Sequence, residues 1–119
     1  MASFNKFNVF VSDCATKVHN LNSDVLKVML SNSAPVATNT VKTNITDLST
    51  ANGYTAGGAT ATFVSGNNTS GTYKLILAAT AWTASGGSIG PFQYAVLYNS
   101  TAASGNLIGW WDYGAAVRL

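Results

Sequence analysis

From residue 24 onward the sequence alternates short β-prone runs with turns rich in Gly, Ser and Asn, and this alternation restricts the chain to a few antiparallel folds. VLKVML (25–30) and QYAVLY (93–98) are rich in aliphatic and aromatic residues and short for helices. NGYTAGG (52–58), GNNTSG (66–71) and NSTAASGN (99–106) are typical turn segments, because Gly and Asn tolerate positive φ. A chain that turns back after each short run is expected to pair its strands antiparallel.

Two hairpins are expected from this pattern. The first joins ATATFV (59–64) to TYKLILA (72–78), and the second joins QYAVLY to LIGWWDYG (107–114). AAVRL (115–119) then begins what we expect to be a further strand. QYAVLY is apolar on both faces, so it is expected at the centre of a sheet.

VLKVML is expected to bury one face only. Leu26, Val28 and Leu30 alternate with Lys27 and its neighbours, as in a strand with one buried side. The later segment 31–44 is polar and contains a proline, which indicates a connection.

Residues 4–20 predict an amphipathic helix at the N-terminus. The residues that recur at helical spacing are Phe4, Phe7, Val11, Cys14 and Val18. The 119 residues fit a single domain, 1–119, with the helix over about 4–20 and a β region over about 24–119. The fold class is therefore mainly β: an antiparallel β-sandwich, or a compact sheet with one N-terminal amphipathic helix.

Charge is scarce in this chain and limits what it can bind. Only 8% of residues are charged, against about 25% in an ordinary domain, so Ser, Thr, Asn and Gly must supply the polar surface. Such a surface fits a secreted β domain, or a surface that a partner covers, since neutral groups are easier to desolvate than charges. The net charge of +2 comes from scattered basic residues, so no nucleic-acid partner is expected. No apolar stretch approaches the roughly 18 residues of a membrane span, so no membrane partner is expected either.

Residues for catalysis or metal binding are few. Cys14 and His19 are the only cysteine and the only histidine, which predicts no intrachain disulfide, no metal site and no cofactor. On a helix the two would lie about 140° apart, so they would not converge as nucleophile and base. We expect Cys14 to be buried and His19 to lie on the surface. No catalytic residue is assigned, and the chain is not expected to be an enzyme.

Aromatic residues supply the candidate contact surface. Trp110 and Trp111 are adjacent, so a strand carrying them places one indole on each face, and one of the two needs a cover. These side chains could fill the core, meet another chain, or stack on a sugar. The candidate interface residues are Phe4, Phe7, Trp110, Trp111 and Tyr113.

Five blocks carry a resemblance to a known family. They are FNKFNVFV near the N-terminus, LNSDVLKVMLSNSAP, NGYTAGGAT, PFQYAVLYN and the closing LIGWWDYG. In that order the chain resembles a family of small virion structural proteins of tailed bacteriophages. The resemblance implies a capsid decoration (cement) protein that stabilises the head shell by packing against the major capsid protein and against itself. It also implies a homo-oligomer, with a trimer favoured, and no cofactor.

Alternative functions remain open at this point. The chain could be a tail tube, baseplate or fibre-associated structural protein, or a carbohydrate-binding module for host attachment. The N-terminal segment lacks the features of a signal peptide, so we expect synthesis in the host cytoplasm and a final place in the virion, on the head surface in preference to the tail. Relatives of this kind continue past the DYG segment with a closing strand. A chain that ended at Leu119 would leave a sheet edge open to pairing with another chain.

Overall fold

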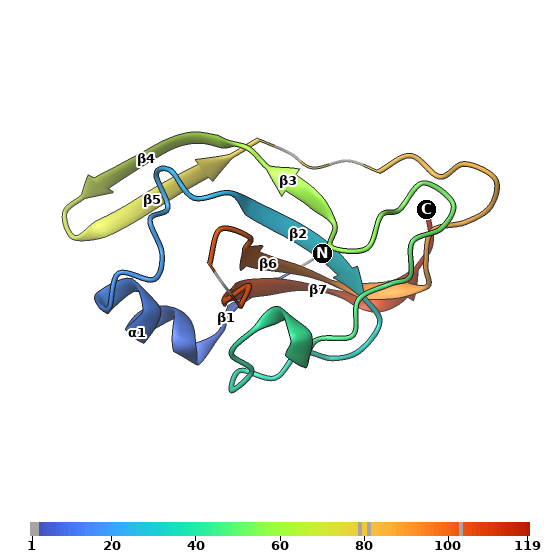
Figure 1. Cartoon of the computed structure of the whole chain (residues 1–119), viewed down its shortest axis with the longest axis horizontal. Helices are drawn as coiled ribbons and strands as arrows, with labels where there is room; N and C mark the ends of the chain where they lie inside the picture. The colour runs from blue at the N-terminus through green and yellow to red at the C-terminus, as the bar shows by residue number, and fades with distance from the viewer. Residues whose placement is uncertain (1–2, 79, 81, 103) are drawn as a thin grey trace.

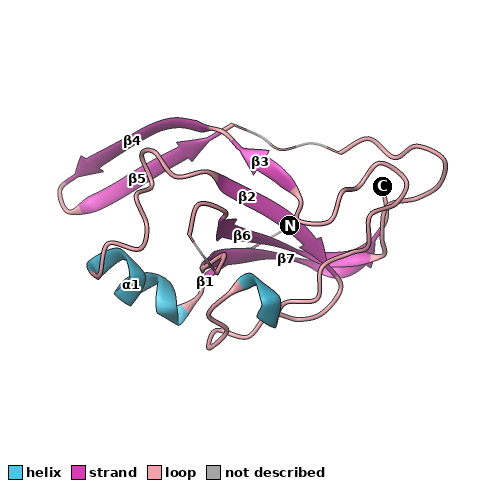
Figure 2. Ribbon diagram, viewed as in Figure 1, coloured by secondary structure: helices cyan, strands magenta, loops and turns pink. Residues whose placement is uncertain are grey.

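A computed structural model describes residues 3–78, 80, 82–102 and 104–119. In these residues the chain forms an N-terminal α-helix and two antiparallel sheets, which confirms the mainly β fold class with one N-terminal helix (Figures 1 and 2). The elements are β1 (Ser3–Lys6), α1 (Asn8–Ala15), β2 (Leu26–Ser31), the 3₁₀ helix η1 (Lys42–Asn44), β3 (Ala59–Ala61), β4 (Phe63–Thr69), β5 (Thr72–Leu77), β6 (Phe92–Asn99) and β7 (Leu107–Val117).

The larger sheet has five strands in the order β1-β7-β6-β2-β3. Strand β6 is its centre, as the two-sided apolar pattern of QYAVLY predicts. Strands β4 and β5 form a separate two-stranded sheet, which we call the hairpin arm. In Figure 1 the arm extends along one side of the molecule, above α1 and the larger sheet.

Both faces of the larger sheet carry a hydrophobic core. The first core lies on the face toward Phe7 and Trp110, and the second lies on the face toward the hairpin arm and Trp111. The fully or largely buried residues of the first are Phe7, Met29, Ile45, Val96, Tyr98 and Leu107. Those of the second are Leu26, Val28, Ala61, Leu97 and Ile108. Successive residues of β6 enter opposite cores, because strand side chains alternate between faces.

Strand β2 is buried on both faces, so the prediction of one buried face was wrong. Met29 is 1% exposed and belongs to the first core, whereas Val28 is 6% exposed and belongs to the second. The sequence pattern suggested a solvated face because Lys27 lies on it. In the sheet, however, β2 lies between β6 and β3, and the segment that contributes Ile45 covers the face of Met29.

The predicted helix at 4–20 is shorter than expected and presents a different face. Phe4 lies in β1, where it pairs with Trp111 of β7, and the helix begins only at Asn8. It ends at Ala15, and Lys17 adopts a left-handed φ of 68°. The apolar stripe is not its buried face, since Val11 is 58% exposed. A helix of eight residues is only marginally stable by itself, so its packing sets its orientation. Pairing with β7 makes the segment before the helix, residues 3–6, a strand.

The strand boundaries of both predicted hairpins also need correction. ATA at 59–61 pairs with β2, and the partner of β5 is Phe63–Thr69, which runs through the predicted turn 66–71. The reversal is made by Ser70 and Gly71 alone, both with positive φ, as in a two-residue hairpin turn. AAVRL begins no separate strand, because β7 continues unbroken to Val117. One residue of the predicted loop 99–106, residue 103, lies outside the described residues.

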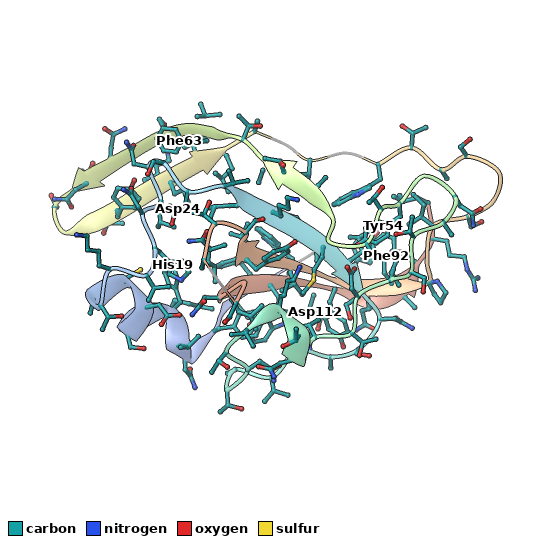
Figure 3. All side chains as sticks on the ribbon, in the orientation of Figure 1. His19, Asp24, Tyr54, Phe63, Phe92 and Asp112 are labelled. Atoms are coloured by element: carbon teal, nitrogen blue, oxygen red, sulfur yellow. The ribbon has the colours of Figure 1, made fainter. Side chains whose placement is uncertain are left out.

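A third apolar cluster surrounds Tyr54 where β2 ends and β6 begins, and Figure 3 shows Tyr54 close to Phe92 of β6. The Tyr54 side chain is 1% exposed and packs with Leu30 and Ile89. Its hydroxyl donates a hydrogen bond to Asp47 and accepts one from the backbone N–H of Leu30 at 3.0 Å. Burial, together with the Asp47 carboxylate, raises the pKa of Tyr54 well above its ordinary value. One phenol thus joins the loop that carries Asp47 to β2.

Replacing Tyr54 with Phe should destabilise the fold, because the buried N–H of Leu30 and the Asp47 carboxylate would each lose a partner. We expect a loss of about 1–3 kcal/mol in the free energy of unfolding, measured by urea denaturation. Tyr113→Phe is the matched control. The Tyr113 side chain is 54% exposed, so this change should leave the free energy of unfolding almost unchanged. Equal losses for the two variants would contradict the role given to the Tyr54 hydroxyl.

Gly58 and Gly71 give a second matched pair. Both adopt positive φ, 83° and 85°, so alanine at either site carries a backbone strain of about 1 kcal/mol. A Cβ at Gly71 meets nothing within 4 Å, whereas at Gly58 it collides with the backbone carbonyl of Val28. Gly58→Ala should therefore cost about 1–3 kcal/mol more than Gly71→Ala in the same unfolding measurement. Similar costs would show that β2 and the 52–58 turn are not in close contact.

Candidate functional site

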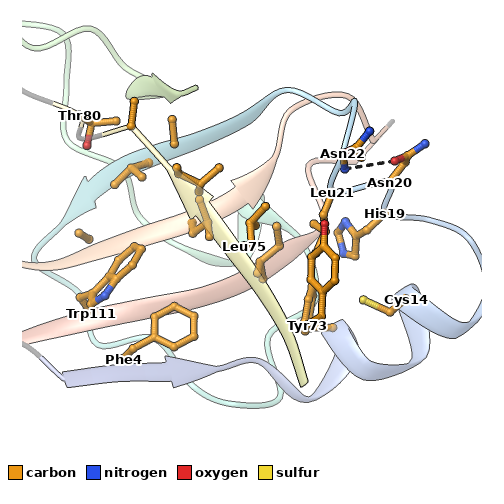
Figure 4. Close-up of a pocket in the computed structure, with 18 of the residues that line it drawn as sticks. Phe4, Cys14, His19, Asn20, Leu21, Asn22, Tyr73, Leu75, Thr80 and Trp111 are labelled. Atoms are coloured by element: carbon orange, nitrogen blue, oxygen red, sulfur yellow. Dashed lines mark hydrogen bonds between the residues drawn. The ribbon is translucent and has the colours of Figure 1, made fainter. Parts of the chain in front are cut away.

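An apolar groove with a volume of about 1090 Å³ lies beneath the hairpin arm. Its floor is the second-core face of the larger sheet, and the inner face of β5 forms its roof (Figure 4). The described residues that line it are Phe4, Phe10, Cys14, Lys17, His19, Asn20, Leu21, Asn22, Val28, Ala61, Tyr73, Leu75, Leu77, Ala78, Thr80, Trp82, Ala95, Leu97, Ile108 and Trp111.

The two ends of the groove differ in polarity. Figure 4 shows Phe4 and Trp111 at one end, and Tyr73, His19 and the Asn20–Asn22 turn at the other. Cys14 also lies at the second end (Figure 4), and Lys17 belongs there because it lies in the chain between Cys14 and His19. The groove is therefore an apolar channel with a polar, cationic end.

The five predicted interface residues separate into three environments. Phe4 is 50% exposed, lines the groove and packs against Trp111, with ring centroids 5.0 Å apart. Phe7 is fully buried in the first core, where it contacts Trp110 at 4.5 Å, so Phe7 does not lie on the surface. Tyr113 is 54% exposed and does not line the groove. The two indoles lie on opposite faces of β7, as their adjacency predicts.

A buried polar network lies beside the cationic end and was not predicted. His19 and Asp13 are each 8% exposed, and Asn99 is fully buried. The Asn99 amide lies 2.9 Å from Nδ1 of His19 and donates to Asp24 at 2.7 Å. Asn106 donates to Asp13 at 3.0 Å. The network joins α1 and the following turn to both ends of the β6–β7 connection.

The contacts of Asn99 determine the protonation of His19. Asn99 Nδ2 is a donor, so Nδ1 of His19 accepts and the ring proton lies on Nε2. Nε2 is buried and faces the Asp13 carboxylate at 3.8 Å, which is too long for a hydrogen bond, and the residues that the structure describes offer it no other partner. Burial lowers the pKa of His19, and the opposing effects of Asp13 and Asp24 are smaller. The folded protein therefore favours a neutral imidazole.

The predicted positions of Cys14 and His19 are reversed, because Cys14 is exposed and His19 is buried. Cys14 is exposed because α1 turns Asp13 inward and Cys14 outward, whereas His19 follows the helix and contacts the buried Asn99. Partial burial and the neighbouring Asp13 raise the pKa of the Cys14 thiol, which disfavours the thiolate. His19 directs its ring nitrogens toward Asn99 and Asp13 rather than toward sulfur. The local arrangement is thus suited to holding the turn against the sheet.

Acidification should weaken the fold through His19. Its pKa in the folded state lies below the unfolded value of about 6.5, so the unfolded chain takes up the proton first. The contribution of His19 is therefore complete above about pH 6.5 and is lost as the pH falls toward its folded pKa. Urea midpoints measured between pH 7.5 and 5.5 should fall for the parent protein. They should fall less for His19→Gln, which cannot titrate, and an equal fall in both would contradict this role.

The sequence contained only a weak signal for this network. His19, Asp13 and Asp24 are close in sequence, but Asn99 lies 75 residues after Asp24 and Asn106 lies 93 residues after Asp13. Asn99 and Asn106 are the flanks of a segment that has the composition of an ordinary turn. Pairing of β6 with β7 and β2 was needed to place them beside the helix.

Comparison of the chain with protein-family models, with curated proteins and with solved structures finds no match. Within the described residues, no helix combines the length and apolarity that crossing a membrane requires. Nor do those residues include a cluster of three or more His, Cys, Asp or Glu side chains suited to a metal ion.

Proposed function

We propose that the chain is a non-enzymatic structural protein of a tailed-phage virion, and within the virion a capsid decoration (cement) protein. It would stabilise the head shell by packing against the major capsid protein and against copies of itself, with a trimer as the favoured assembly. The phage attribution rests on the five sequence blocks that resemble the virion family. The structural feature that supports a packing role is the apolar groove, a large unfilled surface in a chain with few charges.

Two half-exposed aromatic residues extend the contact surface from the groove, which Phe4 lines, along the β1–β7 side of the larger sheet. Phe4 and Tyr113 are about half exposed, and β1 and β7, which carry them, are paired at the edge of the larger sheet. Half-exposed aromatic side chains supply a large contact area at low entropic cost when a partner covers them. Neutral polar neighbours make that desolvation easier than charged ones would.

A carbohydrate-binding role has less support from this geometry. A sugar stacked on an indole still needs hydrogen-bonding groups for its hydroxyls. Trp111 lies at the apolar end of the groove, against Phe4, while the amide side chains gather at the opposite end (Figure 4). The geometry therefore favours protein contact over sugar binding.

The test of the proposal is the location of the protein in intact particles. Imaging of particles that carry a tagged copy should place the protein on the head shell, at three-fold or quasi-three-fold positions. Location on the tail alone would overturn the cement assignment and leave a virion structural role. Absence from purified particles would overturn the virion assignment itself.

A binding assay with isolated shells tests the aromatic surface. The double variant Phe4→Ser with Tyr113→Ser should bind shells at least about tenfold more weakly than the parent, because two aromatic contacts are lost. Val36→Ser is the control, since Val36 is equally exposed at 55% but lies in the loop after β2. Equal weakening by both changes, or by neither, would contradict the assigned surface.

A further inference from the structure

The apolar groove is bordered by a strand whose second edge is unpaired. Among the described residues β5 pairs with β4 alone. The lining of the groove includes Tyr73, Leu75 and Leu77 of β5 but no residue of β4. The free edge of β5 therefore lies on the groove side of the hairpin arm, where Figure 4 shows this strand crossing above the larger sheet.

The hairpin turn determines which backbone groups of β5 are free. Ser70 and Gly71 form a two-residue turn, so the flanking pair Thr69 and Thr72 directs its N–H and C=O groups between the two strands. Backbone direction alternates along an antiparallel strand, and Tyr73 and Leu75 consequently point theirs toward the free edge. Natural edge strands are commonly protected by several charges or by proline. In β5 the only such residue is Lys74.

The side chains of β5 alternate between two faces with the same two-residue period as its backbone groups. Tyr73, Leu75 and Leu77 line the groove, whereas Ile76 points to the opposite side and is 40% exposed. A strand added at this edge would continue the pleat and send every second side chain into the groove. The floor of the groove, which includes Val28, Leu97 and Ile108, would receive these side chains. An extended segment with apolar residues at alternate positions would both pair with the free edge of β5 and fill the groove.

The charge of the groove fixes the polarity of one end of that segment. With His19 neutral, Lys17 carries the one formal charge among the described lining residues, and no carboxylate lines the groove. Asn20 and Asn22 lie at the same end (Figure 4). An acidic residue or a terminal carboxylate at that end of the occupant would complement the ammonium group.

We propose that the free edge of β5 and the groove beneath it bind an extended strand from a neighbouring polypeptide by β-augmentation, with alternate apolar residues in the groove and an anionic group near Lys17. The inference deepens the proposed function and rests on it for the source of the strand. An acyl chain would fill the groove but leave the backbone groups of Tyr73 and Leu75 unpaired. A second copy could offer the edge of its own β5, but that strand carries Lys74 and no carboxylate, so it would not complement Lys17.

The probe is a synthetic acetylated peptide of about eight residues, the length of a typical strand, that alternates threonine with valine or isoleucine and ends in glutamate. Titration should shift the fluorescence of the tryptophans, because Trp82 and Trp111 line the groove. Amide hydrogen exchange, followed by NMR, should show new protection at Tyr73 and Leu75. Protection at these two amides distinguishes strand addition from simple filling of the groove.

Two variants and a matched control locate the site. Leu75→Ser should weaken peptide binding about tenfold, because a groove side chain is lost, whereas Ile76→Ser on the opposite face of the same strand should leave binding unchanged. Lys17→Asn keeps a residue that tolerates positive φ and removes the charge, so it should weaken binding of the acidic peptide and not that of an amidated, uncharged version. If Leu75→Ser fails to fold by circular dichroism, Lys17→Asn still tests the site.

Several outcomes would overturn the inference. One is undiminished binding of a peptide whose alternate amides are methylated, because methylation removes the edge hydrogen bonds. Another is binding of oleate in place of the peptide, with no protection of Tyr73 and Leu75, which would mark an acyl-chain site. Failure of the peptide to bind a protein that imaging finds on the head would reject the strand site and keep the proposed function. Peptide binding by a protein that is absent from particles would keep the strand site and reject the proposed function.

Discussion

The structure depends on one constraint, which is that β6 is buried on both faces. Val96 and Leu97 are neighbours in the chain, and each is at most 5% exposed, so both sides of the central strand must be covered. Different parts of the chain provide the two covers. Phe7 and the Ile45 segment close one face, and the hairpin arm with the Trp82 segment closes the other. The second cover is incomplete, and the apolar groove is the space it leaves.

Burial of β6 also explains why its last residue is polar and fully enclosed. Asn99 ends the strand, where backbone groups of the following turn need partners. Its side-chain oxygen accepts from the N–H groups of Thr101 and Ala102, while its amide meets His19 and Asp24. A buried amide with all of its contacts satisfied fixes one arrangement of the surrounding segments, since a shift would leave polar groups without partners. The segment that follows α1 is therefore held against the end of the central strand.

Local pattern predicted the elements of the chain better than their partners. QYAVLY identified the central strand, and the adjacent tryptophans predicted indoles on both faces of β7. The helix at 4–20 failed because Phe4 gains more by pairing with β7 than by extending a short helix. The predicted solvated face of β2 failed because the cover on Met29 comes from a loop with no periodic signal. These errors share a cause, which is that long-range pairing overrides local propensity in short elements.

The sequence by itself determined the class of the fold and the scarcity of chemical groups, because turn residues, strand periodicity and composition are local properties. It also placed Phe4 and Trp111 among the candidate contact residues, Phe4 from the apolar stripe of the predicted helix and Trp111 from its position next to Trp110. The tertiary structure decided which faces are covered, why His19 is buried, and where the groove and the open edge of β5 meet. The physical reason is that these features arise from contacts between residues far apart in the chain, such as Asp24 with Asn99 and Phe4 with Trp111. Only the paired sheet brings those residues together.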